Sequence, residues 1–316
     1  MRLGLRLLQC LLPTLVVVYL LKCHVLDLED QYRAGVYFFA WLKNHRSHEY
    51  KGLVAPHAQP GDKIIVMAKL EAEWTDWVEE ELPDWQRAIY VVNPSRNTLA
   101  DTSTLTTPLN KGHESMAYLT YIIDHYDSLP STVAFLHPHR AGFFMAWHTD
   151  EPLHDNVEAM RSLRLGYVQR NGYVNLRCNW NPGCKPDHRY NRHVTEQVWR
   201  EIFEGTSTPP NITDTQSSQS SLTPTDATAA AAAQSVLSIP DQIGAACCAQ
   251  FVVSRNQIRK RPRSDYLQFR QWVVDTNKTD AISGRVMEFL WHVIFGKDSV
   301  YCPDEQVCYC QVYGHC

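Results

Sequence analysis

Apolar runs alternate with amphipathic segments through most of the chain. The runs at 63–70 (KIIVMAKL), 88–92 (AIYVV) and 132–137 (TVAFLH) predict buried strands. Between the first two, EAEWTDWVEEELPDWQ has the charge and aromatic spacing of a short helix. A second helix is predicted in NKGHESMAYLTYIIDHYDSLP, where one helical face carries apolar side chains, those of Met116, Leu119, Ile122, Ile123 and Tyr126.

The alternation continues toward the C-terminus. The segments 172–178 (GYVNLRC) and 250–254 (QFVVS) predict strands, and 284–296 (GRVMEFLWHVIFG) predicts a helix. This order of elements predicts an α/β fold, a single three-layer domain over 26–316 with a mixed, largely parallel sheet. Such a sheet would be Rossmann-like or glycosyltransferase-A-like.

One segment departs from this pattern. Residues 206–238 are almost entirely Ser, Thr, Pro, Ala and Gln, and they offer too little apolar surface to offset the entropy of ordering. Because strand-like, cysteine-bearing segments flank it on both sides, we interpret it as a disordered insertion within one domain.

The N-terminal segment, residues 1–25, is hydrophobic. Two arginines precede an apolar run from Leu7 to Leu21, which Lys22 closes. The run is short for a spanning helix, which needs ~20 residues, yet no small-x-small cleavage pattern follows it. We favour a single-pass membrane anchor over a cleaved signal, with a buried core helix as the remaining alternative. The flanking charges would place the N-terminus in the cytosol and the domain in the lumen.

The cysteines bear on the compartment. Eight of the ten follow residue 177, and an even, clustered number indicates disulfides in an oxidising compartment: Cys178, Cys184, Cys247, Cys248, Cys302, Cys308, Cys310 and Cys316. A zinc site between Cys302 and Cys316 is the weaker alternative, because their spacing lacks the usual paired C-x2-C. Sequons at Asn211 and Asn277 are candidate glycosylation sites in a lumenal protein.

The net charge limits the choice of partners. A formal charge of −4 gives no global attraction to nucleic acid or to an acidic membrane. A local basic run could still contact a phosphate backbone, although most such runs are solvated faces; it carries Arg255, Arg259, Lys260, Arg261 and Arg263.

The pair Asp155 and Glu158, in HDNVE, raises a choice between chemistry and capping. At a spacing of three residues both carboxylates fall on one helix face, where they could share a proton or hold a cation. The same spacing is that of a capping box with Asp155 at the N-cap. Local sequence alone favours the cap.

Histidines follow the third predicted strand. His137, His139 and Arg140 in FLHPHRAG stand where a buried strand ends, with His148 close by, and ligands of open α/β sheets bind at that edge. Two histidines could move protons or bind a metal, or one could be structural. We favour a functional site here.

The helix that feeds this strand opens with NKGHE. Asn110, Lys111 and Glu114 could receive an anionic group at the helix N-terminus, and an ordinary turn is equally compatible with them. Glu288 and His292 we interpret as a structural pair beside core residues. The chain has no P-loop, G-x-G-x-x-G, G-x-S-x-G or strand-end D-x-D, so we expect no metal and no cofactor.

Several of these segments together resemble a known family. NKGHESMAYLTYIIDHYDSLP, FLHPH, GYVNLRCNWNPGC, CCAQFVVSR, SGRVMEFLWHVIFG and CPDEQVCYCQVYG, within 88–316, are similar to a fungal family long described only as a domain of unknown function. That family includes arginine-containing cyclodipeptide synthases, which join two tRNA-activated amino acids into a diketopiperazine. The resemblance therefore implies arginyl-tRNA and a second aminoacyl-tRNA as partners, and we infer no protein partner.

The resemblance also implies a D-x-x-E motif that matters for activity. Asp155/Glu158 is our preferred match and Asp76/Glu79 the other, so the expected catalytic residues are Asp155, Glu158, His137 and His139. Substrate contacts are expected from the NKGHE residues, Arg140 and His148. The basic run then becomes a candidate tRNA contact.

Compartment and substrate disagree. Aminoacyl-tRNA is cytosolic, whereas the charge bias, sequons and cysteines favour the lumen. Either the cysteines are reduced and the anchor is inverted or peripheral, or this chain does not use tRNA. The alternatives are therefore a lumenal type II glycosyltransferase-like enzyme, with His137 and His139 replacing the D-x-D, and a non-catalytic, disulfide-bonded membrane protein used for binding.

Overall fold

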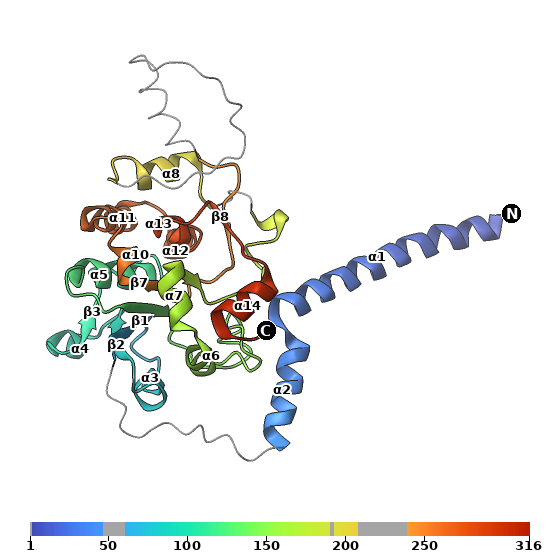
Figure 1. Ribbon diagram of the computed structural model, residues 1–316. Coiled ribbons are helices and arrows are strands. Elements are labelled where there is room, and N and C mark those ends of the chain that lie inside the picture. Colours follow the sequence, from blue (N-terminus) through green and yellow to red (C-terminus); the bar gives the residue numbers. More distant parts are fainter. Residues whose placement is uncertain (1, 47–60, 190–192, 208–238) are drawn as a thin grey trace, which may run out of the picture.

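A computed structural model describes residues 2–46, 61–189, 193–207 and 239–316 (Figure 1). Side chains of residues 2–12 and 45–46 are outside this description. Most of the predicted insertion and the sequon at Asn211 also lie outside the described residues.

One six-stranded sheet organises the domain, in the order β3-β2-β1-β4-β7-β5. Strands β1 to β4 run parallel, whereas β7 is antiparallel to both β4 and β5. The bounds are β1 Lys63–Lys69, β2 Gln86–Val91, β3 Leu105–Thr106, β4 Thr132–Leu136, β5 Tyr173–Asn175 and β7 Phe251–Ser254. A separate short ladder joins β6 (Gly244–Ala245) to β8 (Val300–Tyr301). The predicted α/β fold with a mixed, largely parallel sheet is confirmed.

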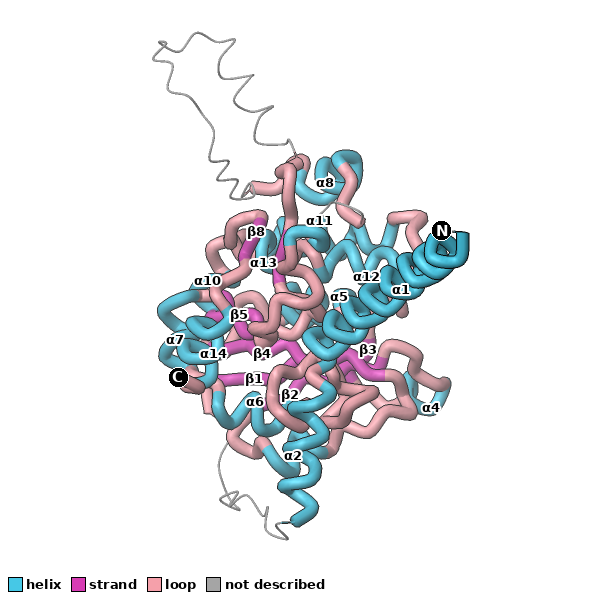
Figure 2. The backbone as a smooth tube through the Cα atoms, turned by 90° about the vertical axis from the view of Figure 1, so that its right-hand side faces the viewer, coloured by secondary structure: helices cyan, strands magenta, loops and turns pink. Residues whose placement is uncertain are grey.

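Helices cover both faces of the sheet, which gives three layers (Figures 1 and 2). Successive residues of a strand point to opposite faces, so Ile64 and Val66 of β1 pack into one core while Ile65 and Met67 pack into the other. On the first face lie α5 (Ser115–Asp124), α8 (Glu196–Phe203), α11 (Arg263–Asp275), α12 (Asp280–Glu288) and α13 (Trp291–Ile294). On the second lie α3 (Trp77–Glu81), α6 (Asn156–Ser162), α7 (Leu165–Asn171) and α14 (Glu305–Tyr313). The remaining helices of the described ranges are α1 (Arg2–Tyr32), α2 (Ala34–Arg46), α4 (Arg96–Ala100), α10 (Arg255–Ile258) and a 3₁₀ turn at Pro186–His188.

Two predicted elements are shorter than expected. The strand at 172–178 ends at Asn175, because the Cys178 and Asn179 N–H groups donate to an Asp150 carboxylate oxygen instead of a neighbouring strand. The helix at 284–296 breaks into α12 and α13, because Leu290 N bonds the carbonyl three residues back and closes a tighter turn.

The sheet order creates a switch point. The chain passes from β1 to β2 on one side, and β4 lies on the other side of β1. Connections therefore diverge above the carboxyl ends of β1 and β4, which is where ligands bind in open α/β sheets. We therefore expect a site at this end of the strands, which we call the carboxyl edge.

Four disulfides lie in the described part of the chain, which confirms the disulfide prediction. Cys178–Cys308 and Cys184–Cys302 span 130 and 118 residues, and loops of that size are worth roughly 5 kcal/mol each in the chain-entropy account. Cys310–Cys316 and Cys247–Cys248 span 6 residues and 1 residue. The zinc alternative is wrong for this form, because its four cysteines are divided among three disulfides.

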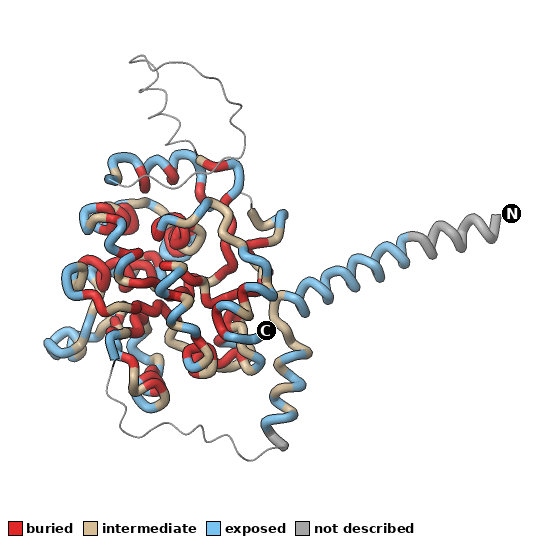
Figure 3. The backbone as a smooth tube through the Cα atoms, in the orientation of Figure 1, coloured by how far each residue is buried: buried red, intermediate tan, exposed pale blue. Residues whose placement is uncertain are grey.

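Helix α1 projects away from the domain, and its described apolar side chains are exposed (Figure 3). The buried-core-helix alternative is therefore wrong. Its C-terminal end is held by polar contacts: Arg177 donates to the Gln31 carbonyl at 2.8 Å, and Asn179 to the Asp30 carbonyl at 2.6 Å. Among the described residues, no helix meets the length and hydrophobicity that crossing a membrane requires.

Candidate active site at the carboxyl edge of the sheet

The loop after β4 is fixed from three sides. The His137 N–H donates to Gln250 Oε1 at 2.9 Å, Trp77 Nε1 donates to the Pro138 carbonyl at 3.0 Å, and Asn156 Nδ2 donates to the His139 carbonyl at 2.7 Å. Because β4 is buried along its whole length, the loop leaves the core with little freedom. The position predicted for a functional site is thus a rigid one.

His137 joins two other groups of this edge. Its Nδ1 lies 3.0 Å from His148 Nε2, and its Nε2 lies 3.9 Å from Glu114 Oε2. That Nε2 atom is buried and has no hydrogen-bond partner among the described residues. Burial lowers the pKa of His137 to about 4, helped by the charges of His139 and His113, and burial also lowers the pKa of His148. Both rings are neutral at pH 7.

Glu114 stands at the N-terminus of α5 with a side chain only 16% exposed. Burial raises its pKa to about 8, and the charges of Glu288 and Asp280 add to that rise, whereas Arg285 opposes it. This carboxyl group therefore holds its proton near neutral pH. The hydroxyl groups of Ser115 and Tyr118, on the same helix, are buried and lack hydrogen-bond partners in the described structure.

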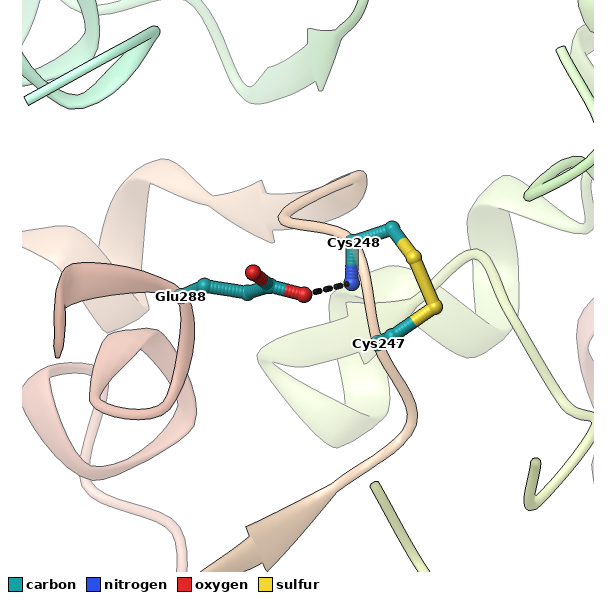
Figure 4. Close-up of side chains that lie close together, drawn as sticks. All are labelled: Cys247, Cys248 and Glu288. Carbon is teal, nitrogen blue, oxygen red and sulfur yellow. Dashed lines mark hydrogen bonds between the residues drawn. A yellow bond between two sulfur atoms is a disulfide. The ribbon is translucent and has the colours of Figure 1, made fainter. Parts of the chain in front are cut away.

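A second carboxylate, that of Glu288 at the end of α12, lies beside the Cys247–Cys248 disulfide (Figure 4). Glu288 accepts from the Cys248 N–H at 2.8 Å and from Arg285 Nη1 at 2.6 Å, and burial raises its pKa. It does not pair with His292, whose Nε2 bonds the Ser299 carbonyl, because α12 ends before the expected helical spacing is completed. The predicted Glu288–His292 pair is wrong.

Metal-binding potential within the described ranges is confined to one group. Cys247, Cys248 and Glu288 offer ligand-type atoms within 4.8 Å of one another. The two sulfur atoms are bonded together, so they are not thiolate ligands in this form.

The loop after β1 supplies a further carboxylate. Glu73 Oε1 lies 3.6 Å from His139 Nε2, and Glu73 Oε2 accepts from the Leu70 N–H at 2.6 Å. Strands β1 and β4 thus each contribute a side chain to the same edge, as expected at a switch point.

Asp155 has a structural place next to this edge. Its Oδ1 accepts from the Val157 N–H at 2.9 Å, which confirms the N-cap, and its Oδ2 lies 3.1 Å from Arg140 Nη1. Arg140 also makes a two-bond contact with Glu81, at 2.5 and 2.9 Å. Burial raises the pKa of Asp155, and Arg140 opposes that rise.

Glu158 and the other carboxylate pair lie apart from the histidines. Glu158 pairs with Arg161 at 2.9 Å, and no hydrogen bond or ion pair links it to His137 or His139 in this described region. Asp76 precedes α3 without a side-chain capping bond, and Glu79 pairs with Arg87 at 2.7 Å on the surface. The structure therefore groups Glu114, rather than either D-x-x-E pair, with the strand-end histidines.

The NKGHE segment divides. Lys111 Nζ donates to the carbonyls of Val274 and Thr276 at the end of α11, whereas Asn110 is exposed. Of Asn110, Lys111 and Glu114, it is Glu114 that reaches His137.

The basic run lies at the opposite end of the strands, the amino edge of the sheet, where the parallel strands begin. It starts after Ser254, which pairs with Thr132 at the beginning of β4. Arg255 donates to the Leu129 carbonyl and Arg259 to the carbonyls of Tyr126 and Asp127. Arg261 is buried in an ion pair with Asp265 at 2.8 Å, and Lys260 and Arg263 are exposed. The structure does not bring this run to the carboxyl edge.

A surface hollow lies elsewhere, between α8 and α11. It is lined by Glu201, Gln268, Trp272 and Asp275, with the exposed Asn277 beside them. Its lining contains no histidine or cysteine. We therefore place the candidate site at the carboxyl edge.

Sequence reasoning missed several members of this cluster. Glu73, Ser115, Tyr118 and the Cys247–Cys248 disulfide were not singled out as site residues. The adjacent cysteines and the acidic residue shortly after the first strand were the available signals; the buried hydroxyl groups gave none.

The fold and this edge define an α/β protein with buried, proton-holding side chains at a sheet switch point. Residues 65–311 match the model of a family described as "Protein of unknown function (DUF3431)". The chain belongs to that family. No curated protein and no solved structure is significantly similar to it.

Proposed function

We propose that the protein is an enzyme that uses Glu114 and His137 for proton transfer. The observation that carries this proposal is the facing pair formed by the Glu114 carboxyl, with a pKa raised to about 8, and the unpartnered His137 Nε2. A general acid or base works best when its pKa lies near the operating pH. His148, bonded to His137 Nδ1, extends the pair into a three-member relay.

The reaction we propose is the synthesis of an arginine-containing cyclodipeptide. It rests on the resemblance of the family motifs. Each aminoacyl ester is already activated, so the enzyme must position an α-amine against an ester carbonyl and remove the amine proton. The amine nitrogen bonds the carbonyl carbon, and the tRNA ribose oxygen leaves with a proton. A second such attack closes the ring.

The buried carboxyl edge suits this chemistry. Glu114 in its ionised form accepts the proton of the attacking amine, and His137 passes it toward His148 or back to the leaving oxygen. Glu73 and Glu288 make the surroundings favourable to a cationic substrate such as arginine. Asp155 then acts as a positioning residue, because it caps α6 and binds Arg140.

A lumenal glycosyltransferase-like enzyme is the second candidate. Four disulfides favour it, because such bonds persist in oxidising compartments, where aminoacyl-tRNA is absent. In that reaction Glu114 would take the proton of an acceptor hydroxyl, and His137 and His139 would stand where a D-x-D usually does.

Expression in yeast with mass spectrometry for cyclo(Arg-Xaa) tests the first reaction. We expect product from the wild type, and Glu114→Gln to lower it by roughly 10²–10⁴-fold. The matched control is Glu196→Gln, since Glu196 is an exposed helix residue paired with Arg200.

The outcomes separate the candidates. Accumulated protein without any arginine diketopiperazine would contradict the synthase, and a sugar-nucleotide hydrolysis lost in Glu114→Gln would then support the second candidate. Full activity of Glu114→Gln in either assay would contradict the site.

A further inference from the structure

The disulfide between Cys247 and Cys248 differs in kind from the two long-range ones. It joins neighbouring residues, whereas Cys178–Cys308 and Cys184–Cys302 span 130 and 118 residues. The entropic stabilisation from a disulfide depends on the length of the chain it closes. A bond between adjacent residues closes almost no loop, so stabilisation of the fold by loop closure does not explain this disulfide.

The disulfide ring coincides with an unusual backbone. Cys248 has φ +94° and the next residue, Ala249, has φ +50°. Residues with a β-carbon rarely adopt positive φ, and such conformations persist only where the surroundings enforce them. The ring and the hydrogen bond from the Cys248 N–H to Glu288 Oε1 hold this turn (Figure 4). Opening the ring removes one of these two constraints.

Two routes lead from this turn to the candidate site. The first passes through Glu288, whose charge raises the pKa of Glu114. The second passes through Gln250, two residues after Cys248, whose Oε1 accepts the His137 N–H at 2.9 Å. The Gln250 side chain also donates to Thr149 and Asn156, at 3.3 and 3.4 Å. A change in the turn therefore acts on both members of the proposed proton-transfer pair.

We propose that Cys247–Cys248 is a redox-active disulfide that a dithiol reductant opens, and that its opening switches the carboxyl-edge site. The reductant's thiolate attacks the sulfur of Cys248, which is the less buried of the two residues, and the sulfur of Cys247 leaves as a thiolate. The reductant's second thiol then displaces Cys248. Two electrons and two protons pass to the protein, and the reductant becomes a disulfide.

The dithiol form has a free backbone at Cys248 and Ala249. The turn relaxes toward negative φ, the N–H leaves Glu288, and Gln250 loses its fixed position under His137. We expect the dithiol form to be the less active one, by roughly 5–150-fold. The change in activity rests on the proposed function, whereas the change in the turn does not.

Limited reduction followed by alkylation and peptide mass spectrometry tests whether a reductant opens Cys247–Cys248 selectively. The experiment uses the full chain with Cys310→Ser/Cys316→Ser, which removes the other short disulfide and leaves the two long ones. We expect a two-thiol species labelled at Cys247 and Cys248 while Cys178–Cys308 and Cys184–Cys302 stay intact. Labelling of either long-range pair first, or no two-thiol species, would overturn the proposal.

Hydrogen exchange on that two-thiol species tests, without an activity assay, whether opening the disulfide loosens the turn and the segment around Glu288. Faster exchange at 247–250 and 284–292, with the rest unchanged, is expected. Unchanged exchange in both segments would overturn the coupling even if no reaction of the protein is found. Where product is measurable, Cys247→Ser/Cys248→Ser should match the reduced wild type and should not respond to reductant; a response in that variant would also overturn it.

Discussion

The amino and carboxyl edges of the central sheet, where its parallel strands begin and end, use charged residues in opposite ways. At the amino edge, Arg255 and Arg259 donate to backbone carbonyls and Arg261 pairs with Asp265. At the carboxyl edge, the side chains of Glu114 and His137 are 16% and 21% exposed, yet their facing atoms form no hydrogen bond with each other.

The difference distinguishes charged residues that stabilise the fold from those that are candidates for catalysis. Buried polar groups in folded proteins are normally hydrogen-bonded, because an unmet donor or acceptor is costly. The arginines of the amino edge follow that rule, and their hydrogen bonds hold α10 against the loop after α5. The carboxyl edge departs from it at His137, Ser115 and Tyr118 together, and a catalytic role is one explanation for buried polar groups without partners.

Replacing Glu114 by Gln tests the carboxyl edge most severely. Beyond the loss of product, its effect on stability has a defined sign. The raised pKa means that the folded state holds the proton more tightly, so the contribution to stability is full below about pH 4.5 and is lost as pH rises through about 8. Glu114→Gln should remove that part of the pH dependence of urea unfolding. An unchanged profile would contradict the burial of this carboxyl.

Arg261→Ala tests the amino edge through stability. The change leaves Asp265 buried without its ion pair, and breaking such a pair costs about 3–5 kcal/mol. Urea unfolding should show that loss, whereas the exposed Arg263→Ala should stay close to wild type. A loss of product at full stability would instead support a role of this edge in binding substrate.

Asp155→Ala is expected to have a smaller effect. Loss of an N-cap costs about 0.5–2 kcal/mol, and loss of the contact with Arg140 adds to it. Asp155→Asn keeps the cap and should recover most of the stability. If Asp155→Asn were as stable as wild type and as inactive as Glu114→Gln, Asp155 would be catalytic and our assignment would be wrong.

Arg259→Ala should have the smallest effect. Its guanidinium is exposed and bonds only carbonyls, so we expect less than about 1.5 kcal/mol of lost stability. Any tRNA binding should keep its dependence on salt. A salt slope reduced by about one in Arg259→Ala would indicate a phosphate contact.

The sequence allowed much of the fold to be predicted and less of the site. Strands with continuous apolar runs, such as β1 and β4, were correctly predicted, since a parallel sheet buries both faces. β5 was overextended because its last residues look strand-like but bond Asp150, a tertiary contact. The partners of Arg255 and Arg259 are backbone carbonyls, which leave no trace in the order of side chains.

The site followed the same division. Placing His137 at a strand end and Glu114 at a helix N-terminus needed only the alternation of elements. That Glu114 faces His137 while Glu158 faces Arg161 depends on how α5 and α6 meet the sheet. Periodicity within one helix cannot specify that arrangement.

The central claim is that Glu114 is a buried carboxyl that keeps its proton near neutral pH. Carbon-detected NMR titration of the side-chain carboxyl groups, compared between wild type and Glu114→Gln, measures this without any assumption about the reaction. We predict that the resonance missing from the variant titrates with a midpoint near pH 8 in the wild type. A midpoint near the ordinary value of 4.5 would contradict the account.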